Sequence, residues 1–280
     1  MMKRLPGIVC VLFLLSTSAF TQTKAVVMTY NIRLNVQSDG ENWWENRKDK
    51  VTALMNYYEA DFIGAQEVQF EQLVYLRSAL PDYSSIGVGR DDGKEQGEFS
   101  CILFNQTKYK PVAQGTFWLS QTPDKVSMGW NAVCNRVCTY GLFEHIKTKK
   151  KLWVFNTHFD HVGDTARMES AKLIMERIKE LTAKQKYPVV FTGDFNSQPT
   201  DAPVQHISQH LNNARMISTM PPYGPVATWN AFKFHEVPKG WIDHVFVSKT
   251  ISVQKYAVIT DSYDKKYPSD HFPVLVHLTF

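Results

Sequence analysis

Six short segments of the chain each place a carboxylate, amide or imidazole at the end of an apolar run. They are Thr29-Tyr30-Asn31, Gln66-Glu67-Val68, Asn156-Thr157-His158, Gly193-Asp194-Phe195-Asn196, Ile242-Asp243-His244 and Ser269-Asp270-His271. A strand end holds such a polar group rigidly at the edge of a core, and several strand ends can converge on one hollow. Because the set is acidic and rich in imidazole, it suits a divalent metal and a phosphate ester.

Glu67 is the strongest candidate for a metal ligand. It follows the apolar run Phe62–Ala65, and a carboxylate at the end of a buried strand is costly unless it is paired or bound to a metal. Mg²⁺ takes oxygen ligands and keeps several waters, so a few side chains are enough to hold it. We expect Asn31 and Asp270 to lie near Glu67 in this site. A surface ion pair is the competing interpretation.

Asp194 and Asn196 follow the run Val189–Thr192, with Gly193 between. Gly193 permits a tight turn or a close approach of the backbone to a ligand. If strand geometry continued past the turn, the two side chains would point the same way. One could then accept a proton from water while the other donates to a phosphate oxygen. An Asx-turn that closes the strand explains the same residues.

His158 and His271 are candidates for donating to phosphate or moving a proton. Each imidazole needs a carboxylate to fix its tautomer and favour its charged form. Asp243 is a plausible partner for His271, and Glu98 for His158. Three neighbouring residues could support them: Asp160, His161 and His244.

Arginines and aromatic residues supply weaker candidates for contacts with a substrate. Arg136 and Arg167 could meet a phosphate, although structural ion pairs are the simpler explanation for both. Trp229 could stack against a base or a sugar, or it could cover the edge of the core. The same two interpretations apply to Trp43, Trp44 and Phe232.

The pattern of apolar residues indicates many strands and few helices. Helical spacing occurs around residues 51–58 and 171–181, with a third helix over 71–80, and Asp164 or Thr165 could cap the second of these. This mixed order predicts an α+β fold in one domain, about residues 24–280, with two sheets packed together and helices outside. Strand-like runs occur at Ala25–Tyr30, Phe62–Ala65, Phe99–Phe104, Val137–Ile146, Leu152–Thr157, Val189–Thr192, Ile242–Val247, Ile251–Ile259 and Pro273–Phe280.

The first residues resemble an export signal. Lys3 and Arg4 precede an apolar stretch from Ile8 to Leu15, which is too short to span a bilayer. We expect residues 1–22 to be a signal peptide and the protein to be periplasmic or secreted, without a transmembrane anchor after signal removal. A buried N-terminal strand or an uncleaved anchor is the alternative.

The overall composition excludes few classes of function. The chain has 280 residues, of which 44% are apolar, and a formal charge of +4 that is too small to imply nucleic acid as a partner. No stable protein partner is evident. Cys10 lies in the expected signal peptide, and its removal would leave Cys101, Cys134 and Cys138. An odd number of cysteines argues against a disulfide framework, although a Cys134–Cys138 bridge is an alternative.

Taken in order, the six segments resemble the endonuclease/exonuclease/phosphatase superfamily, the group that contains DNase I. The resemblance covers nearly the whole chain after the signal, and the order of all six motifs is far more specific than any one of them. The segment from Gly115 through Trp130 to Arg136 is similar to an uncharacterised, exported bacterial branch. The resemblance implies a DNase I-like four-layered α/β/β/α sandwich and a phosphoesterase that uses Mg²⁺ or Mn²⁺.

The resemblance also implies roles for individual residues. Glu67 would hold the metal, with Asn31 and Asp270 contributing directly or through water. Asp194 would position or deprotonate the attacking water, and Asn196 would orient it. His271, paired with Asp243, would stabilise charge on the phosphate, while His158 with Glu98 matches a second histidine and its acidic partner.

The substrate stays open among phosphate esters, whether a small phosphorylated molecule, a nucleic acid or a lipid head group. A phosphodiesterase or phosphatase is the leading hypothesis, and a DNase-like endonuclease is the alternative. A nuclease needs a basic groove, for which the lysines within residues 147–151 are the candidate, although a solvated hairpin tip explains them equally well. A non-catalytic binding protein on the same fold is the second alternative.

Overall fold

The computed structural model describes residue 2 and residues 22–280, so the expected signal peptide lies almost entirely outside the described residues. No helix among the described residues is both long and apolar enough to cross a membrane. The strands are β1 (Lys24–Asn31), β2 (Phe62–Val68), β3 (Tyr83–Ile86), β4 (Phe99–Asn105), β5 (Tyr109–Trp118), β6 (Val137–His145), β7 (Lys151–His158), β8 (Val189–Asp194), β9 (Asn212–Asn213), β10 (Asp243–Val247), β11 (Ser252–Val258) and β12 (Val274–Thr279). The helices are η1 (Gln37–Asn42), α1 (Trp44–Tyr58), α2 (Phe70–Ala79), α3 (Asp164–Lys184), α4 (Ala202–His210) and α5 (Ala214–Ile217).

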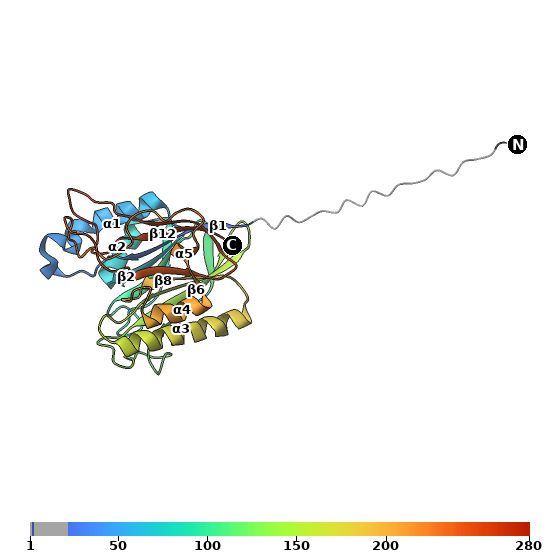
Figure 1. The fold of residues 1–280 in the computed structure, drawn as a ribbon, viewed down its shortest axis with the longest axis horizontal. Helices are drawn as coiled ribbons and strands as arrows, with labels where there is room; N and C mark the ends of the chain where they lie inside the picture. Colours follow the sequence, from blue (N-terminus) through green and yellow to red (C-terminus); the bar gives the residue numbers. More distant parts are fainter. Residues whose placement is uncertain (1, 3–21) are drawn as a thin grey trace.

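The strands form two six-stranded mixed sheets, which pack face to face (Figure 1). The order is β11-β12-β1-β2-β4-β3 in the first sheet and β5-β6-β7-β8-β10-β9 in the second. In each sheet a central pair is parallel, β1 with β2 and β7 with β8. The two central pairs face one another across the sandwich.

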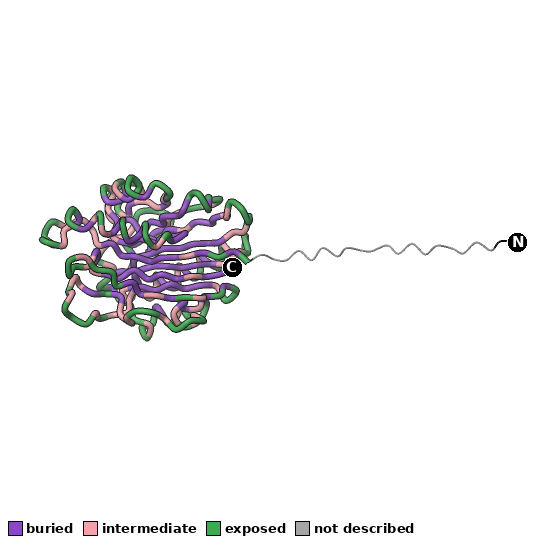
Figure 2. The backbone as a smooth tube through the Cα atoms, turned by 90° about the horizontal axis from the view of Figure 1, so that it is seen from above, coloured by how far each residue is buried: buried purple, intermediate pink, exposed green. Residues whose placement is uncertain are grey.

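Helices cover the outer face of each sheet. Side chains of α1 and α2 pack with outward-facing residues of the first sheet, and α3 and α4 do the same on the second. A third apolar cluster, which includes Val27, Phe62 and Val154, fills the space between the sheets. Because successive residues of a strand point alternately into an inner and an outer cluster, many strands are buried along most of their length (Figure 2). The predicted α+β fold, a DNase I-like four-layered α/β/β/α sandwich, is therefore confirmed.

The strands that were not predicted lie where the alternation of apolar and polar residues is weakest. Every strand-like run coincides with a strand, but the edge strands β3, β5 and β9 were not predicted. Of these, β5 is largely exposed and has a register shift after Pro111. The prediction that Asp164 or Thr165 caps α3 was wrong. Gly163 is the N-cap residue, and Asn131 Oδ1 from a distant loop accepts the Ala166 amide at 2.8 Å.

A buried polar cluster joins the two sheets just beneath the strand ends. Asn156 of β7 donates to the carbonyls of Ala65 (2.9 Å) and Cys101 (2.8 Å) in the first sheet. Gln66 Nε2 donates back to Asn156 Oδ1 at 2.6 Å. Gly64 makes room for this contact, since a Cβ there would lie 2.6 Å from Asn156 Oδ1 and nearer still to Thr192. The cluster therefore fixes how the two sets of strand ends face each other.

Candidate active site

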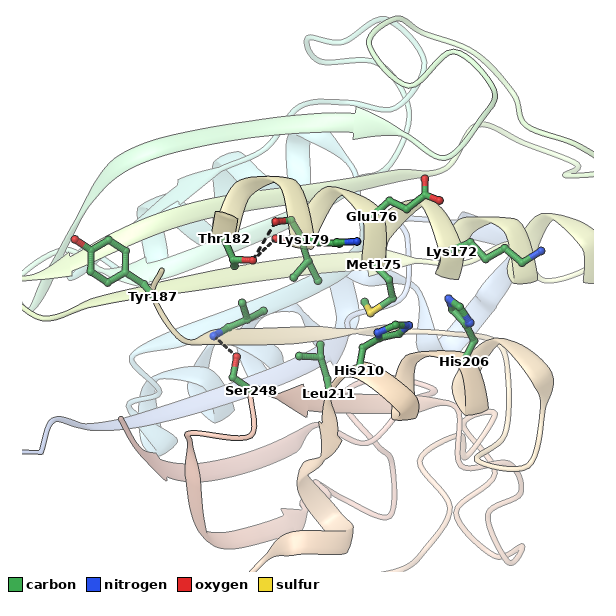
Figure 3. Close-up of a pocket in the computed structure, with 12 residues that line it drawn as sticks. Lys172, Met175, Glu176, Lys179, Thr182, Tyr187, His206, His210, Leu211 and Ser248 are labelled. Atoms are coloured by element: carbon green, nitrogen blue, oxygen red, sulfur yellow. Dashed lines mark hydrogen bonds between the residues drawn. The ribbon is translucent and has the colours of Figure 1, made fainter. Parts of the chain in front are cut away.

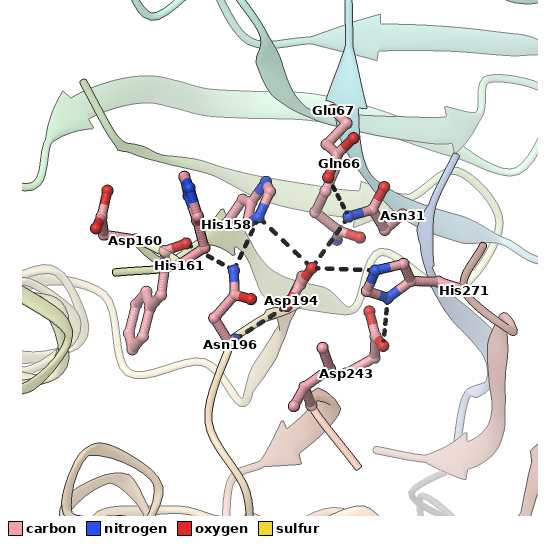
Figure 4. Close-up of polar contacts among 12 residues, drawn as sticks. Asn31, Gln66, Glu67, His158, Asp160, His161, Asp194, Asn196, Asp243 and His271 are labelled. Atoms are coloured by element: carbon pink, nitrogen blue, oxygen red, sulfur yellow. Dashed lines mark hydrogen bonds and ion pairs between the residues drawn. The ribbon is translucent and has the colours of Figure 1, made fainter. Parts of the chain in front are cut away.

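Strand register brings the motif residues together at one end of the sandwich. In the second sheet, His158 of β7 pairs with Asp194 of β8, and Asp194 pairs with Asp243 of β10. In the first sheet, Asn31 pairs with Gln66, and Asp270 and His271 lie shortly before β12. The side chains of Asn31, His158, Asp194, Asp243 and His271 converge in space (Figure 4). A cavity of about 540 Å³ opens there, lined by Glu67, Glu98, His158, Asp194, Asn196, Asp270 and His271, among others.

A β-bulge turns Glu67 toward this cavity. Residues 66 and 67 of β2 oppose the single residue Ser100 of β4, and Glu67 has a positive φ of 59°. The bulge lets Gln66 bond inside the sandwich while Glu67 accepts from Asn31 Nδ2 (2.9 Å) and the Leu34 amide (3.1 Å). Left-handed backbone at a non-glycine residue is strained, and such strain concentrates at functional sites.

His271 lies between two aspartates. Its Nδ1 donates to Asp243 Oδ2 at 2.9 Å, and its Nε2 lies 3.7 Å from Asp194 Oδ2. Burial on its own would lower the pKa of His271, but the charges of Asp243 and Asp194 outweigh it and hold that pKa well above its ordinary value. His271 is therefore an imidazolium that stabilises negative charge beside it.

Asp194 has the properties of a general base. Burial, together with the charge of Asp243, raises its pKa to about 7. Asn31 Nδ2 donates to its Oδ2 at 3.0 Å, and the Asn196 amide donates to its Oδ1 at 2.9 Å, so the carboxylate is held in one orientation. A carboxylate whose pKa lies near neutrality accepts a proton from water more readily than an ordinary aspartate.

His158 is neutral, in contrast to His271. Burial, with Arg136 and Arg90 adding to it, keeps its pKa well below the ordinary value. Asn196 Nδ2, which can only donate, lies 3.1 Å from His158 Nε2 and 3.0 Å from the Phe159 carbonyl. The His158 proton must then be on Nδ1, which lies 3.8 Å from Glu98 Oε2. Asn196 thus holds His158 in a defined tautomer.

The donor set of Glu67 and Asp270 fits a divalent metal. Both carboxylates line the cavity, and burial raises the pKa of Asp270 with Glu67 adding to the effect. A cation bound between the two carboxylates would offset this effect on Asp270, and Arg33 Nη1 approaches Glu67 Oε2 only to 3.8 Å. Asn31 directs its amide nitrogen at Glu67 and Asp194, while its oxygen accepts from Arg33, so here it orients the acids.

Of the other residues predicted to contact a substrate, some line the cavity and some do not. Arg136 is buried and lines the cavity, and Trp229 lies at its rim. Arg167 donates to the Asp160 carbonyl at 3.0 Å and is not among the residues that line the cavity. Trp44 is buried in the core between α1 and the first sheet. The cysteines at 101, 134 and 138 are free, so no Cys134–Cys138 bridge forms.

Two arginines important to the site were not singled out in the sequence. Arg90 donates to Glu98 at 2.7 Å and lines the cavity. Arg47 on α1 is buried, and it donates to the carbonyls of Arg33 (2.8 Å), Pro268 (3.1 Å) and Ile32, so it ties together the segments next to Asn31 and Asp270. The one signal for Arg47 was a cation in the first turns of an otherwise amphipathic helix.

A second large hollow lies away from this chemistry. It runs between α3 and α4 and has an apolar floor that includes Met175 and Leu211 (Figure 3). Lys172, Lys179, His206 and His210 stand around it. None of the residues from the six motifs lines this hollow, so we place the active site at the strand ends.

Comparison with known proteins agrees with the geometry. A structure of an endonuclease/exonuclease/phosphatase family protein from Bacteroides thetaiotaomicron is 38% identical, covers 93% of this chain and 96% of its own, and has a TM-score of 0.89. A mannosyl-6-phosphatase from that organism is also 38% identical, with 91% and 100% covered and a TM-score of 0.89.

More distant proteins share the fold. The human nocturnin catalytic domain, with bound sulfate, is 20% identical over 92% of this chain and 97% of its own, with a TM-score of 0.71. The model of the endonuclease/exonuclease/phosphatase family matches residues 28–271. The chain therefore belongs to the endonuclease/exonuclease/phosphatase family of phosphoesterases and nucleases, and it is a phosphoric ester hydrolase.

Proposed function

We propose that this protein is an exported, Mg²⁺- or Mn²⁺-dependent phosphatase that hydrolyses the phosphomonoester of a small sugar-like molecule. One observation carries the proposal. The buried chain Asp243–His271–Asp194 ends in the same cavity as the metal-suited pair Glu67 and Asp270. Water activation and charge stabilisation can therefore act on one phosphorus atom.

The residues of this chain divide the work in a hydrolysis by in-line attack of water. Asp194 accepts a proton from the attacking water, and the Asn196 amide helps to hold the Asp194 carboxylate. His271, kept charged by Asp243, stabilises the negative charge that builds on the phosphoryl oxygens. His158 is neutral, with its Nδ1 proton toward Glu98, and completes the polar wall.

Glu67 and Asp270 would hold the metal, with Asn31 orienting Glu67. A divalent ion bound there would polarise a phosphoryl oxygen and stabilise the leaving oxygen. The carboxylate oxygens and the room left for water match the preference of Mg²⁺ and Mn²⁺ for hard ligands.

Cavity size and charge distribution support a small substrate over a polynucleotide. The cavity volume of about 540 Å³ lies within the range of small-molecule sites. The lysine run of residues 147–151 lies in the turn from β6 to β7 and at the first residue of β7. His158 is at the opposite end of that strand, so the run does not extend the site into a basic groove. A neighbour of 38% identity being a mannosyl-6-phosphatase favours a sugar monoester.

Export stays a proposal based on the first residues alone. Lys3 and Arg4 precede the apolar stretch of residues 8–15, as in a cleaved signal. Fractionation of cells that express the full chain, with mass spectrometry of the N-terminus, should find a protein outside the cytoplasm that begins near residue 23. A full-length chain in the cytoplasmic fraction would remove this part of the proposal.

Hydrolysis of p-nitrophenyl phosphate against bis-p-nitrophenyl phosphate tests the chemistry. We expect release with Mg²⁺ or Mn²⁺, no release with chelator, and preference for the monoester. Asp194→Ala should lose activity, and Asp124→Ala, which removes an exposed acid on a surface loop, should keep it. Preference for the diester would point to a phosphodiesterase, and no metal-dependent release from either ester, sugar phosphates or DNA would favour a binding protein.

Metal binding has a readout that does not depend on turnover. A divalent ion that binds the folded state raises the melting temperature by mass action. We expect Mg²⁺ or Mn²⁺ to raise the melting temperature of the wild type and to have little effect on Glu67→Gln. An equal rise in both proteins would place the ion elsewhere.

A further inference from the structure

The cavity has a second polar wall with two arginines, Arg90 and Arg136, that the proposed mechanism does not use. Figure 4 shows His161 beyond His158, on the side away from Asp194. Arg136 Nη2 donates to His161 Nδ1 at 3.0 Å, and Arg90 pairs with Glu98 on the same wall. All of these residues line the cavity.

Both arginines have hydrogen atoms without acceptors. Arg136 is only 4% exposed, yet its Nε and Nη1 have no hydrogen-bond partner among the described residues. Arg90 Nε is buried and lacks one as well. A guanidinium cannot lose its proton to avoid this cost, so each buried N–H group needs an acceptor. Oxygen atoms of a ligand in the cavity are positioned to supply it.

The charge on this wall is already balanced. Arg90 Nη1 lies 2.7 Å from Glu98 Oε2, and Arg136 Nε lies 3.6 Å from Asp160 Oδ2. A second phosphate or carboxylate on the substrate would need surplus positive charge, which this wall does not have. A hydroxyl group needs only a donor and an acceptor, and the free N–H groups beside carboxylate oxygens provide both.

A metal ion is a poor occupant for the same wall. Cys134, Asp160 and His161 bring one potential ligand atom each within 4.8 Å of one another. The guanidinium of Arg136 already bonds His161 and lies beside Asp160, so a cation there would meet a fixed positive charge. The backbone amides of Val162 and Gly163 also occupy Asp160 Oδ1.

Trp229 supplies an aromatic surface at the mouth of the cavity. Its side chain is 40% exposed, and its backbone forms a bridge with His271, so its position is tied to the catalytic groups. It lines both the active-site cavity and an adjoining one formed by residues 229–239. A partly exposed indole can pack against the apolar face of a sugar ring while hydroxyl groups reach polar side chains.

We infer that Arg136, Arg90 and Trp229 form a subsite that binds the hydroxyl groups of a sugar leaving group, beside the groups that cleave the phosphate. This inference rests on the proposed function and names the part of the substrate that sets specificity. The phosphate is held by the charge of His271 and of the metal that Glu67 and Asp270 would bind. The sugar is held by neutral hydrogen bonds on the charge-balanced wall.

Kinetics of Arg136 variants on two substrates test the subsite. With metal present, Arg136→Lys keeps the charge and loses the planar fork, and Arg136→Met loses both. We expect kcat/KM for a hexose 6-phosphate to fall by about 100-fold. For p-nitrophenyl phosphate, whose leaving group has no further hydroxyl groups, kcat/KM should fall by about tenfold or less. The surface variant Arg177→Met is the matched control and should change neither. Equal losses on both substrates would overturn the inference and assign Arg136 to the phosphate.

Binding of a free hexose provides a second test. We expect hexose to inhibit hydrolysis of p-nitrophenyl phosphate competitively in the wild type, with an inhibition constant raised about tenfold or more in Arg136→Lys and Trp229→Ala. Because Trp229 is partly exposed and Arg136 is buried, the Trp229 variant should fold even if Arg136 variants do not. A hexose bisphosphate preferred at least tenfold over the monophosphate, with the preference lost in Arg136→Lys, would overturn the inference in favour of a second anion site. Wild type that hydrolyses neither ester would instead contradict the proposed function.

Discussion

Both ends of the sandwich bury an aspartate beside a hollow of similar size. At one end, Asp194 ends β8 in the cavity of about 540 Å³. At the other, Asp61 precedes β2 and lines a hollow of about 500 Å³ with Lys24, Lys108 and Lys255. The two residues are 5% exposed or less. Burial of a carboxylate therefore does not distinguish the active site from the opposite end.

The partners of the two acids differ. Asp61 Oδ1 accepts from Lys108 Nζ at 2.8 Å, and its Oδ2 accepts from the Val26 amide at 2.8 Å, so one cation and one backbone group satisfy it. Asp194 lies instead among a second acid, a neutral amide and two imidazoles. Burial and the charge of Asp243 raise its pKa, and His271 and Asn31 offset this rise only in part. A buried carboxylate with a raised pKa can exchange a proton near neutral pH and is available for chemistry. A buried carboxylate that is paired with a fixed cation supports the fold.

Replacing each aspartate by asparagine should have a different effect at each end of the sandwich. The largest effect is expected for Asp194→Asn, on turnover. Asp194→Asn removes the proton acceptor with little change in shape, so kcat with metal should fall by roughly two to four powers of ten. The measurement is steady-state hydrolysis of the preferred ester, with circular dichroism to show that the variant is folded. Turnover within tenfold of wild type would remove Asp194 from the mechanism.

The same substitution at the other end should act on stability. Asp61→Asn weakens the pair with Lys108, whose side chain is half exposed, and the bond to the Val26 amide. We expect the free energy of unfolding to fall by about 1–3 kcal/mol, with kcat per folded molecule unchanged. Urea denaturation measures the first and the ester assay the second. A loss of turnover without loss of stability would mean that the far end communicates with the site.

Sequence position predicts which of the two acids faces the site. Asp194 follows its apolar run and Asp61 precedes one, and the carboxyl ends of neighbouring parallel strands meet at the same edge of a sheet. This is why the strand-end motifs could be assigned to one site from the sequence alone. The expectation that all six motifs end apolar runs was wrong for two of them, because Asp243 begins β10 and His271 comes before β12. These residues still join the site because β10 and β12 are antiparallel to their neighbours.

Contacts between distant segments could not be predicted in the same way. The bulge that turns Glu67 outward depends on pairing with β4, and the link from Asn156 to Ala65 depends on how the sheets approach. Arg47 and Arg90 act through backbone and side-chain partners that no local pattern specifies. Periodicity indicates which face is apolar, but it does not indicate which polar group will meet which.

The smallest expected effect is on the pH dependence of stability without metal. The pKa of Asp194 rises from 3.8 to about 7 on folding, so the folded state holds a proton that the unfolded chain has already lost. That stability is fully present below pH 4 and is lost as the pH rises toward 7. Asp194→Asn lacks this loss. In chelator, the melting temperature of the variant should therefore gain on that of the wild type between pH 4.5 and 6.5.

His271 does not contribute to the difference between the two proteins from pH 4.5 to 6.5, because its pKa is raised and the residue stays protonated over this range. Asp61→Asn serves as the control for loss of a buried acid, and it should show no such gain over the wild type. Parallel melting curves for wild type and Asp194→Asn would mean that Asp194 ionises as an ordinary aspartate.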